Sequence, residues 1–401
     1  MTSYIIIGNG IAANAAAESI RTVDKLGSIH IFTRERFCFY YTPALPEYLS
    51  GDQSVDDITI HHDQWYKDNT IDLHLETTIT SIDPAGKTVT TQDKGSFSYD
   101  KLLLATGGYS FVPPIKGTDI DAVFSLRSID DADRIKNKAA SSRKLVLIGG
   151  GLLGLEAGNG LRKAGLNVTV VEFFPRLLPR QMDVDGAAVL QNQLEEMGFS
   201  FCLGAKTQEI INNNGTLSVQ LEEGEHIETD MVLVSAGVRP ELTLAKQLGL
   251  EIDKGVKVND AMETGVENIY AAGDLVEHRG RFYGIWPASM EQGKIAGLNM
   301  AGDNATYNGT VLANSLKVVG ISLTAAGDID PDGTLESIVI RDRDEKIYRK
   351  IVIKDNIIVG TILFGDTRGS DEILAAMKDK KDISSIKSDL SNKKFDFSRL
   401  M

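Results

Sequence analysis

The amino-acid sequence predicts an α/β fold in which one strand–turn–helix unit occurs twice and a smaller α+β region follows. A short β run leads into a glycine-rich turn and a helix at "SYIIIGNGIAANAAAESI", and again at "KLVLIGGGLLGLEAGNGLRKAG". After residue 310 the pattern changes to the β-rich runs "LESIVIRD" and "KIYRKIVIKDNIIVGTILFG", followed by a helical stretch at "SDEILAAMK". We therefore expect two domains with parallel sheets and a small antiparallel sheet near the end of the chain.

Composition narrows the class of protein. The chain has 401 residues, of which 42% are hydrophobic and 24% charged, as is typical of a soluble protein of two or three domains. It has no run of eighteen apolar residues and no basic or apolar leader, so we expect a cytoplasmic protein with no membrane partner. A net charge of −14 argues against a nucleic-acid partner. The two cysteines, Cys38 and Cys202, exclude a disulfide framework and a cysteine-rich metal centre, so no metal is expected.

Each glycine turn predicts a site for a dinucleotide. The first copy has the pattern at Gly8, Gly10 and Ala13, and the second has it at Gly149, Gly151 and Gly154. The first glycine permits the tight turn, and the second lets the backbone approach a pyrophosphate. The third small residue lets the helix pack on the strand, so that the phosphate meets the helix N-terminus.

An acid follows each turn at the end of the next strand. Glu172 ends "NVTVVE", eighteen residues beyond Gly154, and Glu35 has the comparable place after "SIHIFTR". A carboxylate there accepts hydrogen bonds from ribose hydroxyls and repels a 2′-phosphate, so NADH is favoured over NADPH at the second turn. Together the two units predict two Rossmann-like dinucleotide-binding domains, one for a tightly held flavin and one for an exchanging nicotinamide nucleotide.

Three further strand ends agree with this reading. They are Ala105-Thr106-Gly107 after "LLL", Gly237 in "VSAG", and Gly273-Asp274 after "NIYAA". The carboxylate of Asp274 could reach the ribityl hydroxyls of a flavin. The N-terminus of a helix at "WPASMEQGKIAGLNM" could face the pyrimidine edge of the flavin and stabilise its anionic reduced ring.

The ordered set of these motifs resembles the FAD/NAD(P)H-dependent pyridine nucleotide-disulfide oxidoreductase superfamily over about residues 3 to 300. Within it the chain looks most like NADH:rubredoxin oxidoreductases and the flavin half of assimilatory nitrite reductases, on "YYTPALPEYLSG", "VNDAMETGVENIYAAGD" and "LKVVGISLTAAGDI". The resemblance implies a discontinuous FAD domain at 1–110 and 240–310 and an NAD domain at 111–239. It also implies a C-terminal domain at 311–401 that covers the flavin and helps to form a homodimer or docks a carrier. The segment "DKKDISSIKSDLSNKKFDFSRLM" is polar until its last residues, so we expect a tail that orders only on contact.

The resemblance also implies the site residues. FAD would be held by Gly8, Gly10, Ala13, Glu35, Ala105, Thr106, Gly107, Gly273 and Asp274, with the backbone near Ile79 beside the adenine. Trp286, six residues before Gln292, would lie beside the flavin, and the alternative for Trp286 is an ordinary core aromatic. NADH would be held by Gly149, Gly151, Gly154, Glu172 and Gly237, and Glu156 would lie near the contact between nicotinamide and flavin.

The segment "RFCFYYTPALPEYLSG", residues 36–51, lacks the redox cysteine of the disulfide reductases. Pro43 stands where single-cysteine relatives carry the sulfur, and we expect it to shape the turn against the flavin ring. Cys38 lies five residues earlier, too far along a chain that advances about 3.3 Å per residue. Cys38 and Cys202 are therefore expected to be buried small hydrophobic residues, so electrons must leave the flavin directly.

Thr42 and Glu47 stand where the relatives carry cations. If Glu47 approaches Glu156, one of the two carboxylates should have a raised pKa and could donate a proton near flavin N5. The alternative is that Glu47 points to solvent or to a lysine.

We expect hydride transfer from NADH to FAD N5, followed by electron delivery to a small carrier such as rubredoxin. Residues 311–401 contain 15 basic and 15 acidic side chains, so the net charge of −14 lies in the first 310 residues. The neutral end, with its lysines, is the expected docking face for an acidic carrier: Lys378, Lys380, Lys381, Lys387, Lys393 and Lys394. Two alternatives stay open, a peroxide-forming NADH oxidase or quinone reductase, and a flavoprotein subunit of a larger reductase.

Overall fold

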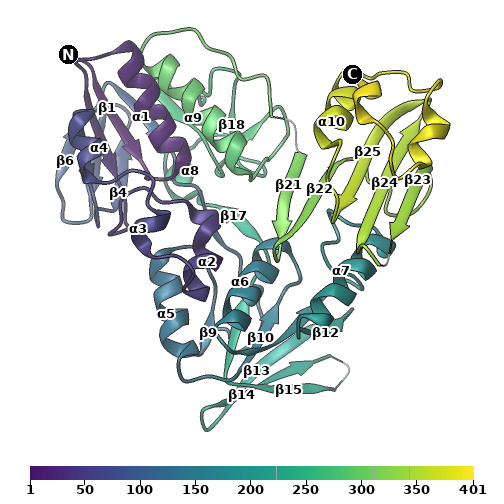
Figure 1. Cartoon of the computed structure of the whole chain (residues 1–401). Helices are drawn as coiled ribbons and strands as arrows, with labels where there is room; N and C mark the ends of the chain where they lie inside the picture. Colours follow the sequence, from purple (N-terminus) through teal and green to yellow (C-terminus); the bar gives the residue numbers. More distant parts are fainter. Residues whose placement is uncertain (223, 311–312, 343) are drawn as a thin grey trace. The chain divides into compact units, whose positions relative to one another are not determined.

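The computed structural model describes residues 1–222, 224–310, 313–342 and 344–401 (Figure 1). The chain forms two compact units, each discontinuous in sequence. The first consists of Met1–Ala44, Ser54–Phe111 and Val238–Val311, and the second of Leu45–Gln53, Val112–Gly237 and Leu312–Met401. The division into three domains expected from the sequence is finer than this and stays a prediction.

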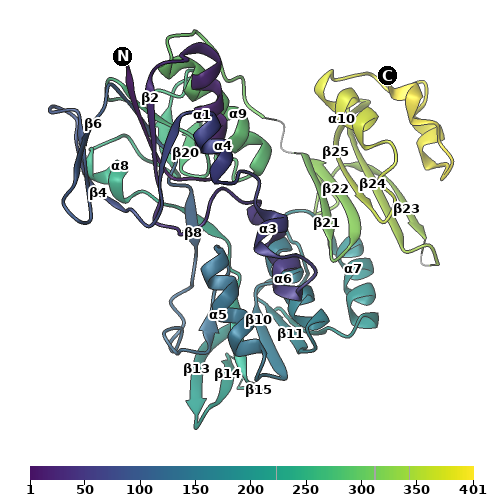
Figure 2. The same cartoon turned by 60° about the vertical axis from the view of Figure 1, so that its left-hand side comes forward.

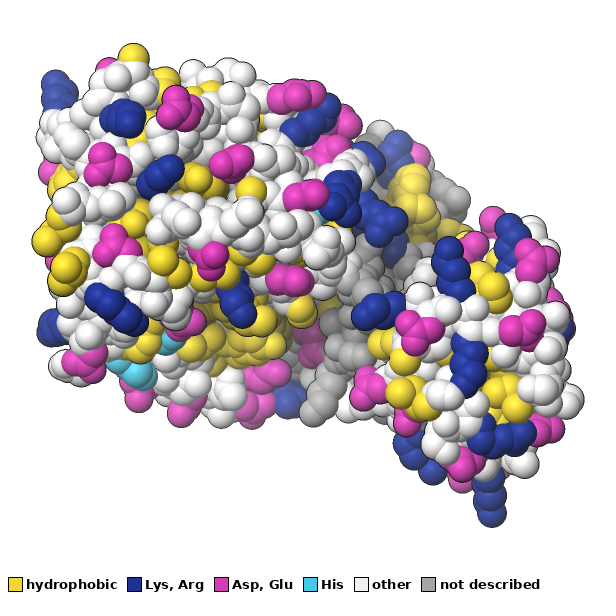
Figure 3. All heavy atoms as spheres, turned by 90° about the horizontal axis from the view of Figure 1, so that it is seen from above, with side chains coloured by type: hydrophobic (Ala, Val, Ile, Leu, Met, Phe, Trp, Pro, Cys, Tyr) yellow, Lys and Arg dark blue, Asp and Glu magenta, His cyan; other side chains and the backbone are white. Residues whose placement is uncertain are grey.

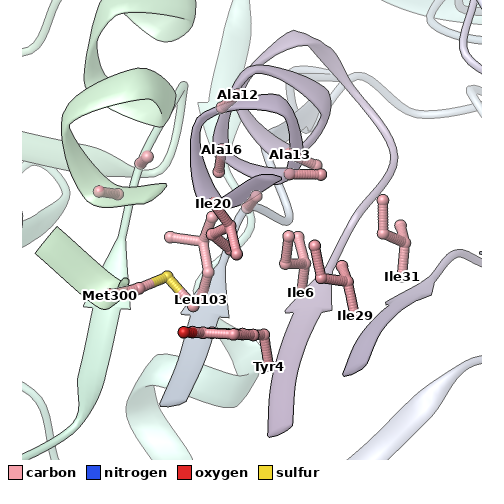
Figure 4. Packing of buried hydrophobic residues seen from close by; sticks show 14 of the residues in the cluster. Tyr4, Ile6, Ala12, Ala13, Ala16, Ile20, Ile29, Ile31, Leu103 and Met300 are labelled. Atoms are coloured by element: carbon pink, nitrogen blue, oxygen red, sulfur yellow. The ribbon is translucent and has the colours of Figure 1, made fainter. Parts of the chain in front are cut away.

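The first unit is built on a parallel five-stranded sheet. Its strands lie in the order β19 (Ile269–Ala271), β7 (Lys101–Leu104), β1 (Ser3–Ile7), β2 (Ser28–Phe32) and β3 (Ile71–His74). Helices α1 (Ile11–Val23) and α9 (Trp286–Met300) pack against each other beside this sheet. Figure 4 shows the side chains of Ala16 and Ile20 on the side of α1 that faces the strands. They belong to a buried cluster that also contains Ile6 and Leu103.

The alanines of α1 explain its close approach to α9. A Cβ added to Gly293 would lie 2.1 Å from the carbonyl oxygen of Ala12, and one added to Gly297 would lie 2.3 Å from that of Ala16. The two helices therefore touch backbone to backbone, which only small residues on both sides allow.

Smaller elements complete the first unit. An antiparallel sheet consists of β4 (Ile79–Asp83), β5 (Thr88–Thr91) and β6 (Ser96–Ser98). Two pairs of short strands are β8 (Gly108–Ser110) with β17 (Val238–Pro240), and β18 (Val256–Val258) with β20 (Val276–His278). The short helices are η1 (Thr42–Ala44), α3 (Val55–Ile58), α4 (Asp63–Asp68) and α8 (Thr243–Gln247).

The second unit has a parallel sheet of the same design. Its order is β12 (Ser200–Leu203), β11 (Asn167–Glu172), β10 (Lys144–Ile148), β16 (Met231–Val234) and β9 (Val123–Phe124). In both sheets the strand before the glycine turn is central, with the next strand of the repeat on one side and a later strand on the other. The helices of this part are α2 (Leu45–Ser50), α5 (Ile129–Ala139), α6 (Leu152–Lys163) and α7 (Val184–Glu196). A separate antiparallel sheet consists of β13 (Thr207–Asn213), β14 (Thr216–Leu221) and β15 (His226–Thr229).

The C-terminal part of this unit is an antiparallel sheet with short helices. The order is β21 (Ala313–Val318), β22 (Ile321–Gly327), β25 (Ile357–Phe364), β24 (Ile347–Lys354) and β23 (Glu336–Asp342). Helix α10 (Ser370–Lys378) packs on β25 (Figure 2). Two short 3₁₀ helices follow it, η2 (Lys387–Ser391) and η3 (Phe397–Leu400). The predicted α/β class with two parallel sheets and a C-terminal α+β part is confirmed.

The expectation of a polar tail that orders only on contact was wrong. Leu390, Phe395, Phe397 and Leu400 are buried in one cluster with Ile373 of α10. The composition of the tail hides this, because four apolar side chains among many charged ones are enough once η2 and η3 turn them to the same side. Within the described part of the chain, no helix is long and apolar enough to cross a membrane.

Candidate functional site

The first glycine turn joins β1 to α1. Gly8 has φ +114°, a conformation that glycine adopts readily, and a Cβ there would lie 2.1 Å from the carbonyl oxygen of Ala105. Ala105 follows β7 and its N–H donates to the carbonyl of Ile7 at 2.8 Å. Gly10 is the N-cap of α1, and an added Cβ would meet no atom of the described residues within 4 Å. The turn is thus crowded on the strand side and open where the helix begins.

The second glycine turn, between β10 and α6, repeats these features. Gly149 has φ +113°, and its added Cβ would lie 2.2 Å from the carbonyl oxygen of Ser235, the residue after β16. Gly151 is the N-cap of α6, and the space beside its Cα is open within the described residues. Gly154 lies against the carbonyl oxygen of Gly149, at 2.7 Å from an added Cβ, so a larger residue would separate helix from turn. The sequence repeat is therefore a structural repeat.

Both helices present an open N-terminus. Neither α1 nor α6 has a side-chain cap or an acidic residue in its first turn. The first N–H groups of a helix have no intrahelical partner and carry a partial positive charge, so they suit a phosphate. The open glycine cradles and the uncapped helices together fit the pyrophosphate of a dinucleotide at each turn.

The predicted residues at the other strand ends of the first unit are held by α9 and by a loop. Gly273 N–H donates to the Oε1 atom of buried Gln292 at 3.0 Å. The carboxylate of Asp274 accepts from Ser289 Oγ at 3.1 Å. Thr106 Oγ1 donates to the carbonyl of Glu241 at 3.0 Å, so Thr106 is tied to the chain beyond β17. Gly107, at φ +64°, follows it directly.

Three other predicted residues of this unit have aromatic or apolar surroundings. Glu35 accepts a hydrogen bond from the Tyr40 hydroxyl at 2.7 Å. Ile79 begins β4 and is 6% exposed in the core. Trp286 stacks on Phe39, with ring centroids 5.8 Å apart, and meets Tyr41 edge-on at 4.9 Å. Trp286 therefore packs on the segment that lacks the redox cysteine.

A polar network beside the first glycine turn was missed by the sequence analysis. Asn9 lies between the two glycines, and its Oδ1 accepts from Asn14 Nδ2 and from the Tyr66 hydroxyl, both at 3.0 Å. The Oδ1 atom of Asn14 is 3.1 Å from His61 Nδ1. Among the described residues the buried Nδ2 of Asn9 has no hydrogen-bond partner, so it is open to an acceptor of a bound group. The one hint of this network in the sequence is Asn9, between the two glycines of "GNG", where the dinucleotide-binding pattern requires no particular residue type.

Glu172, at the end of β11, binds backbone groups with both oxygens of its carboxylate, and its predicted contact with a ribose stays a prediction. The carboxylate is 7% exposed, and both oxygens accept backbone N–H groups, from Gly150 at 2.5 Å and from Phe174 at 2.8 Å. Its hydrogen bonds thus shape the glycine turn and the loop after β11, while its charge stays beside the site. Sequence spacing placed the acid correctly at the strand end but could not show which groups it binds. Gly237, at φ +102°, lies two residues after Ser235 in the turn beyond β16.

Glu156 of α6 is a partly buried carboxylate held by the C-terminal part. Its Oε1 accepts the N–H of Val319, in the turn between β21 and β22, at 2.7 Å. Burial raises the pKa of Glu156, and the charge of Glu47 raises it further, while the Val319 N–H and Lys163 act in the opposite direction. Glu47 lies in the first turn of α2 and is exposed. Glu47 thus faces solvent and still acts on Glu156.

Pro43 lies in η1 and is exposed. The segment 36–51 passes from the first unit to the second shortly after Pro43: Ala44 belongs to the first unit and Leu45 to the second. Within the second unit α2 packs on α6, where Gly160 lies against the carbonyl oxygen of Pro46, 2.5 Å from an added Cβ. The segment therefore joins the two glycine-turn units covalently.

The expectation that both cysteines are buried was wrong in degree. Cys38 and Cys202 are free and partly exposed, since Cys38 lies in a loop and Cys202 on the edge strand β12. Burial and the neighbouring carboxylate of Asp63 raise the pKa of Cys38 to about 11. Burial also raises the pKa of Cys202. Both thiols therefore stay protonated at neutral pH, the unreactive form.

The paired turns define a protein that binds two dinucleotides, and comparison with known proteins agrees. Residues 2–293 match the pyridine nucleotide-disulphide oxidoreductases, and residues 313–381 match the C-terminal domain of rubredoxin NAD+ reductase. The chain belongs to the pyridine nucleotide-disulphide oxidoreductase family, which binds FAD and NAD(P)H.

Two relatives show its place in the family. The NADH-rubredoxin oxidoreductase of Clostridium acetobutylicum is 32% identical over 387 residues, 96% of this chain and 97% of the relative. Its crystal structure covers 98% of this chain and 99% of its own, with a TM-score of 0.83 and 30% identity. The nitrite reductase [NAD(P)H] of Bacillus subtilis is 37% identical over 382 residues, 95% of this chain. The chain spans about half of that relative, 48% of its length.

Proposed function

We propose that the chain is an FAD-dependent NADH oxidoreductase that passes electrons directly from the flavin to a small electron carrier of the rubredoxin kind. The observation that carries the proposal is the pair of glycine turns, each with an open cradle and an uncapped helix, in a chain whose thiols are held protonated. Two dinucleotide sites support an exchange between two cofactors, and protonated thiols argue against a disulfide step.

We assign FAD to the turn of the first unit and NADH to that of the second. The N-termini of α1 and α6 would each hold a pyrophosphate, and Asp274 would accept ribityl hydroxyls. Bound FAD would supply the hydride acceptor and the capacity to release electrons one at a time. The N-terminus of α9 would stabilise negative charge on the pyrimidine edge, and Trp286 would exclude water from the ring.

We assign Glu156 as the group that holds or releases a proton near the site. Its raised pKa brings the protonated form closer to neutral pH, and its second oxygen, Oε2, accepts no hydrogen bond within the described residues. Pro43 would shape the adjoining turn without contributing a reactive atom. Glu47 would act through its charge on Glu156 rather than by contact with substrate.

The proposed docking face on the C-terminal part is smaller than the sequence suggested. Lys387 pairs with Glu336 at 2.5 Å, Lys393 pairs with Asp342, and Lys381 bonds a backbone carbonyl. Figure 3 shows the basic side chains of this part, at the right, interspersed with acidic ones. Within the described residues Lys378, Lys380 and Lys394 are exposed without an ion pair, so these three are the cations we propose for an acidic carrier.

A second candidate is the flavoprotein part of a larger reductase. The half-length match to the Bacillus subtilis nitrite reductase favours it, because there the same region is joined to further sequence.

The NADH preference, a cytoplasmic location and a homodimer are further parts of the proposal.

The proposed function is tested by measuring which electron acceptor the reduced protein reduces fastest. The FAD-loaded protein, reduced by NADH without oxygen, is mixed with rubredoxin, ferredoxin, a quinone and oxygen. The carrier proposal expects fast one-electron reduction of a rubredoxin, slowed by salt and by Lys378→Glu with Lys380→Glu. Fast oxygen consumption with slow, salt-insensitive carrier reduction would refute it in favour of an oxidase. Slow transfer to every acceptor would favour the larger reductase.

A further inference from the structure

Two histidines meet near the carboxyl end of the first parallel sheet. His30 of β2 and His74 of β3 belong to neighbouring parallel strands, and Nδ1 of His30 lies 3.2 Å from Nε2 of His74. Asp72 lies two residues before His74, on the same face of β3, and its Oδ2 atom is 3.5 Å from Nδ1 of His30. Neither histidine belongs to the predicted cofactor sites.

A hydrogen bond between two imidazole rings holds a single hydrogen. One nitrogen carries the hydrogen and the other accepts it with its lone pair. The ionised carboxylate of Asp72 can only accept hydrogen bonds, and it lies beside Nδ1 of His30, so the hydrogen belongs to His30 and Nε2 of His74 accepts it. A proton on Nε2 of His74 would place two N–H groups against each other. The two rings therefore stay joined only while His74 is neutral.

The surroundings of His74 oppose a positive charge on its ring. The ring stacks on Phe32, with centroids 4.3 Å and planes 8° apart, and Phe97 of β6 meets it edge-on at 5.3 Å. Burial lowers the pKa of His74 below its ordinary value of 6.5, and His30 lowers it further, while Asp72 acts in the opposite direction. The side chain of Asp72 is 69% exposed, so water and salt screen its charge. His74 therefore becomes charged only in acid.

The backbone of His74 is bound to the segment that carries Glu35, the acid predicted to hold the flavin nucleotide. The carbonyl of His74 accepts the Thr33 N–H at 3.0 Å. The carbonyl of Thr33 accepts the Thr77 N–H at 2.8 Å, and that of Glu35 accepts the Glu76 N–H at 3.0 Å. These bonds join the chain beyond β2 to the chain beyond β3, at the edge where open α/β sheets bind their ligands. A displacement of His74 would therefore be transmitted to Glu35.

We propose that His30 and His74 form a pH-sensitive switch that weakens the binding of the flavin nucleotide in acid. Protonation of His74 breaks the bond between the two rings, β3 moves away from β2 at this end, and the segment with Glu35 loses its support. The inference rests on the proposed function, in which the first unit binds FAD. It adds a regulation of that site by protons, through two residues outside the glycine-turn motif.

The switch is tested by the Kd for FAD of the full-length apoprotein, measured by equilibrium dialysis between pH 8 and pH 5. The parent protein should bind FAD about tenfold more weakly at pH 5, the scale of losing one hydrogen bond of a charged group. The neutral form of His74 is the stabilising one, so the weakening should begin as the pH falls below 6.5. His74→Gln should lose most of this weakening, because glutamine accepts the hydrogen bond from His30 at every pH.

His30→Gln separates the pair from the burial of His74 alone. A glutamine at this position can turn its amide oxygen toward a protonated His74, so this variant should also lose most of the weakening. The matched control is His62→Gln, since His62 is a more exposed histidine of the same unit, with Nδ1 3.6 Å from Oδ1 of Asp56. The control should retain the whole tenfold weakening.

A Kd for FAD that is the same at pH 8 and pH 5 in the parent protein would overturn the switch. The full weakening in either His74→Gln or His30→Gln would overturn it too, and so would its loss in His62→Gln. Each of these results leaves the proposed function intact. A parent protein that does not bind FAD at pH 8 would instead refute the proposed function, and the switch with it.

Discussion

At the scale of single residues, Glu156 is a partly buried carboxylate whose pKa is raised by burial. Its carboxylate belongs to α6, accepts a hydrogen bond from the turn after β21, and senses the charge of Glu47 on α2. Val319, which donates that bond, is a β-branched residue at φ +54° and 5% exposed. Such a conformation is rare for a β-branched side chain and persists where the surroundings require it. Glu156 therefore holds a strained turn in place.

Glu156→Gln should stabilise the fold at neutral pH. The pKa of Glu156 is raised in the folded protein above its ordinary value of 4.5, so the neutral form is the stabilising one. Its contribution is fully present below pH 4.5 and is lost as the pH rises through the folded pKa. Glutamine stays neutral and can still accept the Val319 N–H, so the gain in melting temperature should grow from pH 4 to pH 8. A gain that is constant over this range, or the same gain in Glu156→Ala, would contradict the assignment.

Glu47→Gln tests the coupling of the two carboxylates through kinetics. Removing the Glu47 charge should lower the raised pKa of Glu156, so the pH midpoint of flavin reduction by NADH should move to lower pH. Lys163→Met should move the midpoint the other way, because Lys163 favours the charged form. If the rate of flavin reduction does not change between pH 5 and 8 in either the parent protein or Glu47→Gln, Glu156 does not take part in the proton transfer.

At the scale of elements, helices α1 and α9 of the first unit cross with their backbones in contact. Gly297→Ala should destabilise the protein by about 1–3 kcal/mol, because its Cβ would lie 2.3 Å from the carbonyl oxygen of Ala16 and the helices would have to separate. This cost outweighs the gain of roughly 1 kcal/mol in helix propensity. Urea unfolding measures it, with Gly265→Ala as the control, since an added Cβ there meets no described atom. Equal effects of both variants would rule out the close crossing.

The sequence predicts these elements unequally well, for physical reasons. Alanine repeats and glycine turns are local signals, so α1, α6 and both turns could be predicted from spacing alone. The burial of Phe397 and Leu400 could not, because it depends on α10 and β25, which lie elsewhere in the chain. The partners of Glu172 could not be predicted either, since position on a strand does not decide whether a carboxylate meets a ligand or the backbone.

At the scale of the whole molecule, the second unit joins two parts that the sequence treats as separate domains. Asp183, at the start of α7, accepts from the Tyr348 hydroxyl at 2.6 Å and pairs with Lys350 at 3.0 Å, both on β24. The three side chains are buried. This network anchors the C-terminal sheet to the nucleotide-binding part of the same unit.

Asp183→Ala should cost about 3–5 kcal/mol, because it leaves the buried ammonium of Lys350 without its counter-charge. The matched control is Asp185→Ala, two residues further along α7, whose pair with Arg341 is about half exposed. A surface pair of this kind contributes about 0–1 kcal/mol. Urea unfolding of the two variants compares them directly, and similar losses would show that the buried network does not anchor the sheet.

In the function that we propose, electrons reach the flavin from NADH and leave it without passing through sulfur. Anaerobic stopped-flow of the FAD-loaded protein with NADH tests it most directly. We expect loss of the oxidised-flavin absorbance with no long-wavelength thiolate-to-flavin band, and the same trace in the variant that carries both Cys38→Ala and Cys202→Ala. A long-wavelength band that disappears in the cysteine variant, or a flavin that NADH does not reduce, would contradict it.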